Sequence, residues 1–221
     1  MNLRLLQLGD SALPIGGYMH SWGLESAVAR RLVSDAPTLE QWTRDWLRHS
    51  LGPLEGVLVG AVWRASTGAE VRRAAEILTA SLAPPTIRRA SLQMGEQLAS
   101  LGSTWGWSSA GISQFERDVP SAHRHHAIVF GLLAALSGAD ERSALISYLH
   151  QAAVGMIGAG VRSIPVGHTH GQQILSYLHD DLAKLATELV GRDTETAGAG
   201  CPFYEVLCDE QFRLGTRLFR S

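Results

Sequence analysis

The chain has 221 residues, with 19 basic and 21 acidic side chains and a formal net charge of −2 at pH 7. This near-balance excludes a broad basic face of the kind that binds nucleic acid or an anionic membrane. The longest strongly apolar stretches, 127–136 and 152–157, are shorter than the roughly 20 residues that cross a bilayer. No linker-like tract divides the sequence and no signal-peptide core opens it, so we expect one cytoplasmic domain over residues 1–221.

Apolar spacing is helical almost throughout the chain and predicts an all-α, bundle-like fold of roughly eight to ten helices. Thr38 followed by Gln41 has the spacing of a capping box and predicts the start of a helix with one apolar stripe. A new helix is expected after a Gly-Pro break at residues 52–53. Another should follow the two prolines at 84–85 and extend to about Leu101.

The second half of the chain contains the two clearest helices. Pro120 is expected in the first turn of a helix containing HHAIVFGLLAAL, which is apolar on every side and should lie at the centre of the fold. The most regular amphipathic helix runs from Ile174 to Leu189, with Asp180 and Asp181 on its charged, solvated face. The one candidate strand, VRSIPV, is interrupted by a proline.

Two segments depart from this amphipathic pattern. One is ALPIGGYMHSWGLESAV at residues 12–28, and the other is AAVGMIGAGVRSIPVGHTHGQQIL at residues 152–175, in which glycine occurs five times. A glycine inside a helix costs about 1 kcal/mol relative to alanine, so several together indicate a close approach of two backbones or a helix break near Pro165. We expect both segments to line the same seam.

Nine histidines raise the possibility of a metal site. The zinc motif His-Glu-x-x-His is absent and neither cysteine has a Cys-x-x-Cys partner, which favours solvated or capping histidines. The alternative hypothesis is a small helical metal-binding enzyme or metallochaperone that uses a cluster of His123, His126, His168 and His170. Within this alternative, His168 and His170 are the weakly favoured metal ligands.

Signals for catalysis are weaker still. The sequence lacks a Gly-x-Ser-x-Gly elbow and a Gly-x-x-x-x-Gly-Lys-Ser/Thr phosphate loop, so we expect no catalytic residue and no cofactor. Protein recognition remains, because aromatic side chains on a glycine-containing turn are typical anchors of a desolvated interface. From spacing alone, Tyr18 and Trp22 could instead pack the first helix onto the core.

Three separated motifs resemble those of a known family. The opening LRLLQLGDSALPIGGYMHSWGLESAV resembles the start of the urease accessory protein UreF family, with its Leu-Gln-Leu, Leu-Pro-x-Gly-Gly/Ala and Ser-x-Gly-Leu-Glu elements. The stretch GAGVRSIPVGHTHGQQIL is similar to the second typical segment of that family, and TRLFRS is similar to its terminus. The resemblance covers the whole chain, although residues 60–120 carry little of it.

The resemblance implies an all-α, non-catalytic homodimer. It implies a scaffold that bridges UreD (also called UreH) and the GTPase UreG, and through them reaches apo-urease, for GTP-dependent insertion of nickel. Nickel would then be bound at the level of the complex. The resemblance further implies that residues at about 209–221 form a partner-docking tail.

Carried over by position, the resemblance assigns a set of residues to partner binding. From the opening motif these are Pro14, Gly16, Gly17, Tyr18, Ser21, Gly23, Leu24 and Glu25, to which we add His20 and Trp22 from the same turn. From the second motif they are Arg162, Pro165, Gly167 and Gln172, and from the terminus Arg217, Leu218, Phe219, Arg220 and Ser221.

The chain departs from the family pattern at two places. His168 stands where the family usually has glutamine, and it is either a local change or an extra nickel contact. Gln211 and Phe212 stand where the family often has His-Glu, so partner contacts are not carried over to residues 209–216.

Overall fold

The computed structural model describes residues 2–215 and 217–220, and every regular element within them is helical. The all-α prediction is confirmed. The helices are α1 (Leu3–Leu8), α2 (Leu24–Ala29), α3 (Ala36–Trp46), η2 (Leu47–Gly56), α4 (Val57–Arg64), α5 (Gly68–Ser81), α6 (Pro85–Thr104), α7 (Ser109–Asp118), α8 (His126–Leu136), α9 (Glu141–Ser163), α10 (His168–Leu189) and α11 (Pro202–Gln211). Short 3₁₀ turns are η1 (Gly17–Met19), η3 (Ser121–His123) and η4 (Thr194–Thr196).

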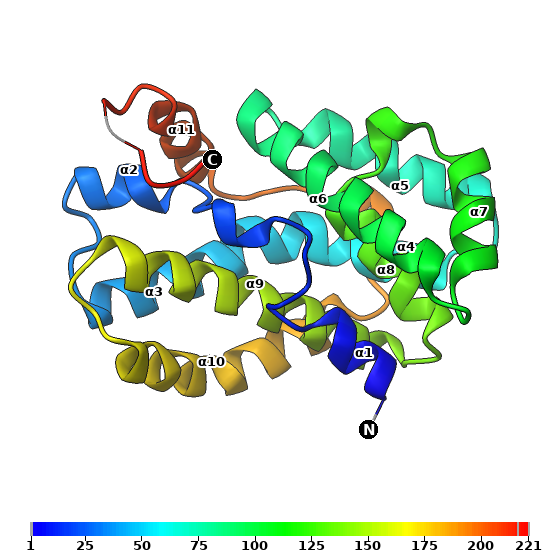
Figure 1. Cartoon of the computed structure of the whole chain (residues 1–221), viewed down its shortest axis with the longest axis horizontal. Coiled ribbons are helices and arrows are strands. Elements are labelled where there is room, and N and C mark those ends of the chain that lie inside the picture. The colour runs from blue at the N-terminus through cyan, green and yellow to red at the C-terminus, as the bar shows by residue number, and fades with distance from the viewer. Residues whose placement is uncertain (1, 216, 221) are drawn as a thin grey trace.

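The helices form two groups, and the long helix α9 packs against both of them. Figure 1 shows α2, α3, α10 and α11 at one end and α4 to α8 at the other, and α9 runs along the middle and packs against members of both groups. The buried apolar side chains of both ends belong to one continuous cluster. By length and composition α9 could cross a membrane, but half of its most apolar window is buried inside the bundle, as in the core helix of a globular protein.

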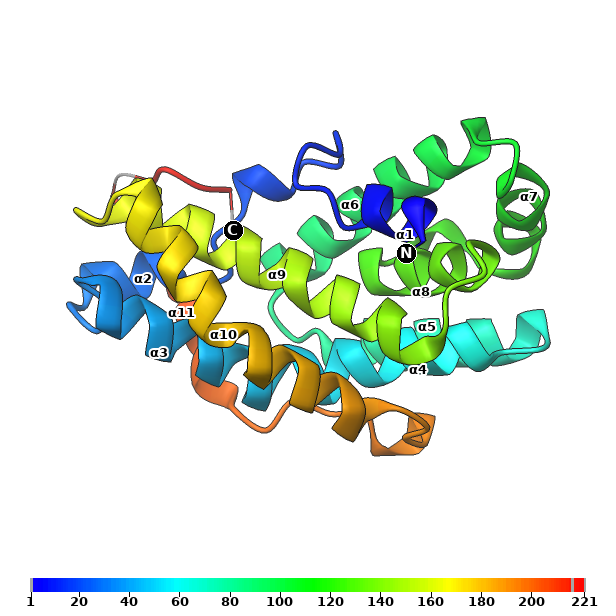
Figure 2. The same cartoon turned by 90° about the horizontal axis from the view of Figure 1, so that it is seen from below.

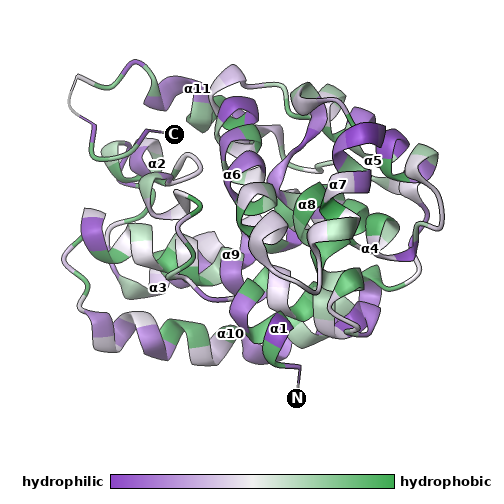
Figure 3. Ribbon diagram, turned by 45° about the vertical axis from the view of Figure 1, so that its right-hand side comes forward, coloured by the Kyte–Doolittle hydropathy of each residue, from purple (hydrophilic) through white to green (hydrophobic). Residues whose placement is uncertain are grey.

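The apolar helix α8 lies at the centre of its group, as its sequence predicts. It packs mainly against α4 and α6, and its residues from His126 to Gly131 are all buried. Figure 3 shows that α8 is almost wholly hydrophobic, whereas α10 alternates hydrophilic and hydrophobic positions. The apolar face of α10 is buried at Ile174, Leu178 and Leu182, while Asp181 pairs with Arg44 of α3 at 2.7 Å.

The expected helix break at residues 52–53 is wrong. The chain continues from α3 through the π-helix η2 into α4 without interruption, with Pro53 inside the helix. In a π-helix the missing N–H of this proline would bond to the carbonyl five residues earlier, that of Arg48. The segment before α11 is hydrogen-bonded to the same helix: Gly200 donates to the carbonyl of His49 at 2.8 Å, and Gly198 donates to the carbonyl of Pro53 at 3.1 Å.

Two predicted helix starts are also displaced. α3 begins at Ala36 because Asp35, a strong N-cap residue, accepts from the backbone of Thr38 at 3.0 Å in a reciprocal capping box. α8 begins at His126, whereas Pro120 precedes the separate turn η3. Arg124 fixes this turn by donating to the carbonyls of Val119 and Glu116 at the end of α7.

Candidate functional site

The turn that precedes α2 directs some of its side chains to solvent and others into the molecule. Its backbone enters the left-handed region at Gly16 (φ 83°) and Gly23 (φ 85°), which glycine adopts at little cost. Between these glycines, η1 exposes 72% of Tyr18, whereas His20 and Ser21 are buried. The aromatic side chain at the tip of the turn is therefore available to a partner without any movement of the backbone.

All three motifs singled out in the sequence meet at Arg162 of α9. Its guanidinium carbon lies 3.5 Å from the ring centre of Tyr18 and 4.8 Å from that of Phe219. The backbone N–H of Arg220 also donates to the carbonyl of Met19 at 2.8 Å. An arginine between two aromatic rings gains cation–π attraction from both of them. We call this surface, formed by Tyr18, Arg162, Leu218 and Phe219, the platform.

The end of the chain is held on the platform by the carboxylate of Glu25. This carboxylate accepts the backbone N–H groups of Leu218 at 2.6 Å and Phe219 at 3.3 Å, and the side-chain amide of Gln211 at 3.1 Å. Gln211 in turn accepts from the hydroxyl of Ser21 at 3.0 Å. Because Glu25 is only 9% exposed, it contacts its own chain and positions the terminal segment.

The predicted partner-binding residues therefore divide into two groups. Some are exposed: Pro14, Gly16, Tyr18, Pro165, Gly167, Gln172, Arg217, Leu218 and Arg220. Others are covered by their own chain: His20, Ser21, Gly23, Leu24, Glu25 and Phe219, with Gly17, Trp22 and Arg162 partly covered. Ser221 lies outside the described residues. Sequence reasoning missed Gln211, whose contacts with Ser21 and Glu25 link residues far apart in the chain.

The structure does not bring the four histidines of the alternative hypothesis together. His123 contacts Thr79 at 2.7 Å, His126 is buried in the core, and His168 and His170 are exposed in the first turn of α10. Across residues 2–215 and 217–220, no group of three or more His, Cys, Asp or Glu side chains could hold a metal ion.

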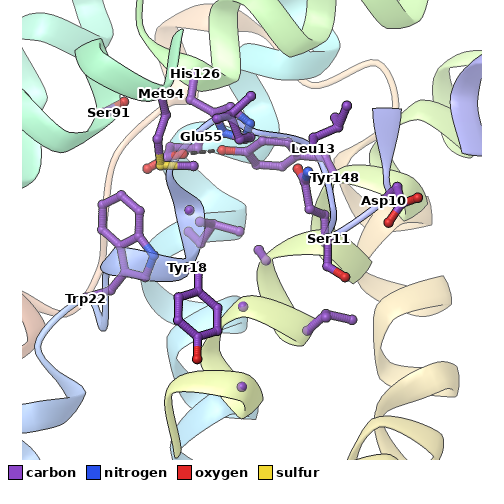
Figure 4. A pocket seen from close by; sticks show the side chains of 18 of the residues that line it. Asp10, Ser11, Leu13, Tyr18, Trp22, Glu55, Ser91, Met94, His126 and Tyr148 are labelled. Atoms are coloured by element: carbon purple, nitrogen blue, oxygen red, sulfur yellow. Dashed lines mark hydrogen bonds between the residues drawn. The ribbon is translucent and has the colours of Figure 1, made fainter. Parts of the chain in front are cut away.

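A cavity of about 270 Å³ lies behind the platform. It is enclosed by the opening segment, η2, α6 and α9, and its walls are mostly apolar. Figure 4 shows Tyr18 and Trp22 at one end, and Glu55, Tyr148 and His126 at the other. Glu55 is the one charged residue in the apolar run 51–63, which is the sequence signal that could have identified this end of the cavity.

The inner end of the cavity contains buried polar groups. The Tyr148 hydroxyl donates to the carboxyl of Glu55, and burial raises the pKa of both groups. Three buried polar atoms of cavity-lining residues have no hydrogen-bond partner in the described part of the chain: His126 Nε2, Gln151 Oε1 and Arg162 Nε. Arg162 lies beside Tyr18, at the other end of the cavity from His126. Because unpartnered buried groups are costly, these three atoms mark the cavity as a place where polar atoms from outside the chain can bind.

The expected seam between the two unusual segments is confirmed, because both line this cavity. The glycines of α9 serve it in two ways. A Cβ at Gly155 or Gly158 would meet no atom within 4 Å, so these residues leave the cavity floor open. A Cβ at Gly160 would collide with Leu39, so that glycine permits α3 to approach α9 closely.

His126 makes the stability of the fold dependent on pH. Burial lowers its pKa from 6.5 to about 4. Between these values the unfolded chain binds the proton and the folded chain does not, so acidification favours unfolding. We expect His126 to remove about 2 kcal/mol of unfolding free energy between about pH 7.5 and about pH 5.

Urea unfolding of wild type and His126→Phe at both pH values tests this expectation. The variant should lose less stability on acidification, by about the same 2 kcal/mol. The test is the difference in acid-induced loss of unfolding free energy between the two proteins. The raised pKa of Glu55 makes acidification stabilise the fold, so the loss in the wild type alone does not report on His126. Equal acid sensitivity of the two proteins would contradict the assignment.

The family model described as UreF matches residues 33–179 of this chain. The chain belongs to the UreF family. It is 31% identical to the urease accessory protein UreF of Cupriavidus metallidurans, over 99% of this chain and 97% of that protein. It is 32% identical to the urease accessory protein UreF of an Arthrobacter species, over 99% of this chain and 96% of that protein, and 31% identical to that of Paenarthrobacter aurescens, over 99% and 97%.

These UreF relatives align with the platform as well as with the helical core. The family model stops short of the opening turn and of the C-terminal segment, whereas the alignments to whole UreF proteins cover 99% of the chain. Tyr18, Glu25 and Phe219 therefore lie outside the residues that the family model matches.

Proposed function

We propose that this chain is a non-catalytic scaffold for urease maturation. It bridges UreD (also called UreH) and the GTPase UreG, acts as a homodimer in the cytoplasm, and supports GTP-dependent insertion of nickel into apo-urease. In this proposal the chain is one domain with a partner-docking tail at about 209–221, and it needs no cofactor of its own. The urease accessory proteins that it resembles over nearly its full length support this assignment.

One observation carries the proposal: three motifs that lie far apart in the sequence converge on a single surface. Tyr18 and Leu218 expose 72% and 68% of their surface there, and Arg162 lies against the rings of Tyr18 and Phe219. Exposed aromatic and aliphatic residues around an arginine are typical of the centre of a protein interface. The positioning of the tail by Glu25 gives this surface a defined shape before any partner binds.

Co-purification of the full-length chain with UreD and UreG from the same organism tests the bridging role. We expect Tyr18→Ala to weaken capture of a partner by roughly 30-fold, the effect of losing about 2 kcal/mol at an interface hot spot. The variant should lose no more than about 1 kcal/mol of unfolding free energy, because Tyr18 is 72% exposed and loses only its cation–π contact with Arg162.

Leu3→Ala is the matched control, because Leu3 is 70% exposed but lies on α1, away from the platform. It should leave complex formation unchanged. Capture of both partners by Tyr18→Ala at wild-type strength would contradict the platform, and failure of the wild type to bind either partner would contradict the scaffold.

A further inference from the structure

A pair of histidines lies on the surface where α9 and α10 pack side by side (Figure 2). His150 of α9 and His179 of α10 have ring centres 6.4 Å apart, with their planes inclined by 34°. His150 is half-buried, whereas His179 is exposed to solvent. The pair takes no part in the platform or the cavity described above.

The surroundings of His150 favour the form that binds metals. Burial, followed by the neighbouring His179, lowers the pKa of His150. A metal ion binds to an unprotonated imidazole nitrogen.

The spacing of the two rings suits a shared ion. Metal–nitrogen bonds of about 2.1 Å place the centres of two imidazoles on one ion roughly 5–6 Å apart. The observed 6.4 Å is slightly longer than this range, so a shared ion requires the exposed His179 side chain to turn toward His150. The two residues project from neighbouring helices that are already packed together.

We propose that His150 and His179 form a two-histidine site for a first-row divalent cation of the nickel, copper and zinc group. Imidazole favours these ions over Mg²⁺ and Ca²⁺, which prefer oxygen ligands. The described residues provide no group of three ligands, so water completes the coordination and the ion exchanges readily. The site rests on its geometry and does not depend on the proposed scaffold function.

Titration of the untagged full-length chain with NiCl₂ tests the site, with calorimetry for affinity and thermal unfolding for stability. We expect one ion to bind and to raise the melting temperature, because it links α9 to α10 only in the folded state. His150→Ala and His179→Ala should each lower the affinity for Ni²⁺ at least about tenfold, and MgCl₂ should have no effect.

The double variant His168→Ala with His170→Ala is the control. It removes the exposed His-x-His pair at the start of α10 and should leave Ni²⁺ binding unchanged. Loss of binding in this variant, or wild-type binding in His150→Ala and His179→Ala, would overturn the proposal. Because His179 is exposed, its replacement preserves the fold, so a loss of binding there reports on the ligand. None of these measurements involves UreD, UreG or urease.

Discussion

Removal of residues 217–221 is expected to abolish both the complex with UreD and the activation of urease, while the helical fold persists. The deletion removes Phe219, which is 5% exposed, from one face of Arg162. It also takes two N–H donors from the Glu25 carboxylate, leaving Gln211 as its partner there. Because one buried phenylalanine is lost, the free energy of unfolding should fall by about 2 kcal/mol.

These effects are measured separately. Circular dichroism reports on the helical fold, and urea unfolding gives the free energy of unfolding. Co-purification tests the complex with UreD, and urease activity of co-expressing cells tests activation. Arg73→Ala is the control, because it removes an exposed ion pair with Glu195 that lies outside the tail. We also expect Glu25→Ala to reproduce much of the binding defect, because the tail would lose its anchor. A truncated chain that still assembles and activates urease would contradict the docking role of the tail.

Gly95→Ala should have the largest effect of a single methyl group on stability. Gly95 of α6 faces the chain that enters α8, and a Cβ there would lie 2.7 Å from the carbonyl carbon of His125 and 2.8 Å from the nitrogen of His126. These are backbone atoms, so no flexible side chain can move aside. We expect a loss of about 3 kcal/mol, at the upper end of the usual cost of overpacking.

Gly155→Ala is the matched control in a second helix. Its Cβ would meet nothing within 4 Å, so the higher helix propensity of alanine should raise stability by up to about 1 kcal/mol. Urea unfolding of both variants measures the contrast. Equal stability changes in the two variants would show that the approach of α6 to α8 is looser than described.

The features that depend on local patterns could be predicted from the sequence. The apolar stripe of α10 and the all-apolar surface of α8 follow from residue spacing, and both occupy the expected places. The seam between the opening segment and the glycine-rich part of α9 also followed, because several helical glycines require a structural reason. The start of α3 was missed because Asp35 is a better cap than Thr38, although both signals are local.

The remaining features depend on contacts between distant residues. Glu25 and Leu218 are 193 positions apart, and no spacing rule relates them. The resemblance places the opening motif on a partner surface, but it cannot distinguish the exposed Tyr18 from the buried Glu25 beside it. The helix around Pro53 also accepts hydrogen bonds from Gly198 and Gly200, near the far end of the sequence, and no local pattern predicts these contacts.

The π-helix η2 gives this chain one place where a continuous helix can change its length by a residue during evolution. Its hydrogen bonds join residues five apart, one more than in an α-helix, so loss of one residue between Leu47 and Leu54 would let the segment close as an α-helix and keep Glu55 on the side of the cavity. Successive residues of an α-helix are separated by about 100° around its axis, so the same loss within α4 would rotate its buried face away from α8. Differences of one residue in homologous genes are therefore expected within residues 47–56 and in connections such as residues 105–108, and to be absent from α4.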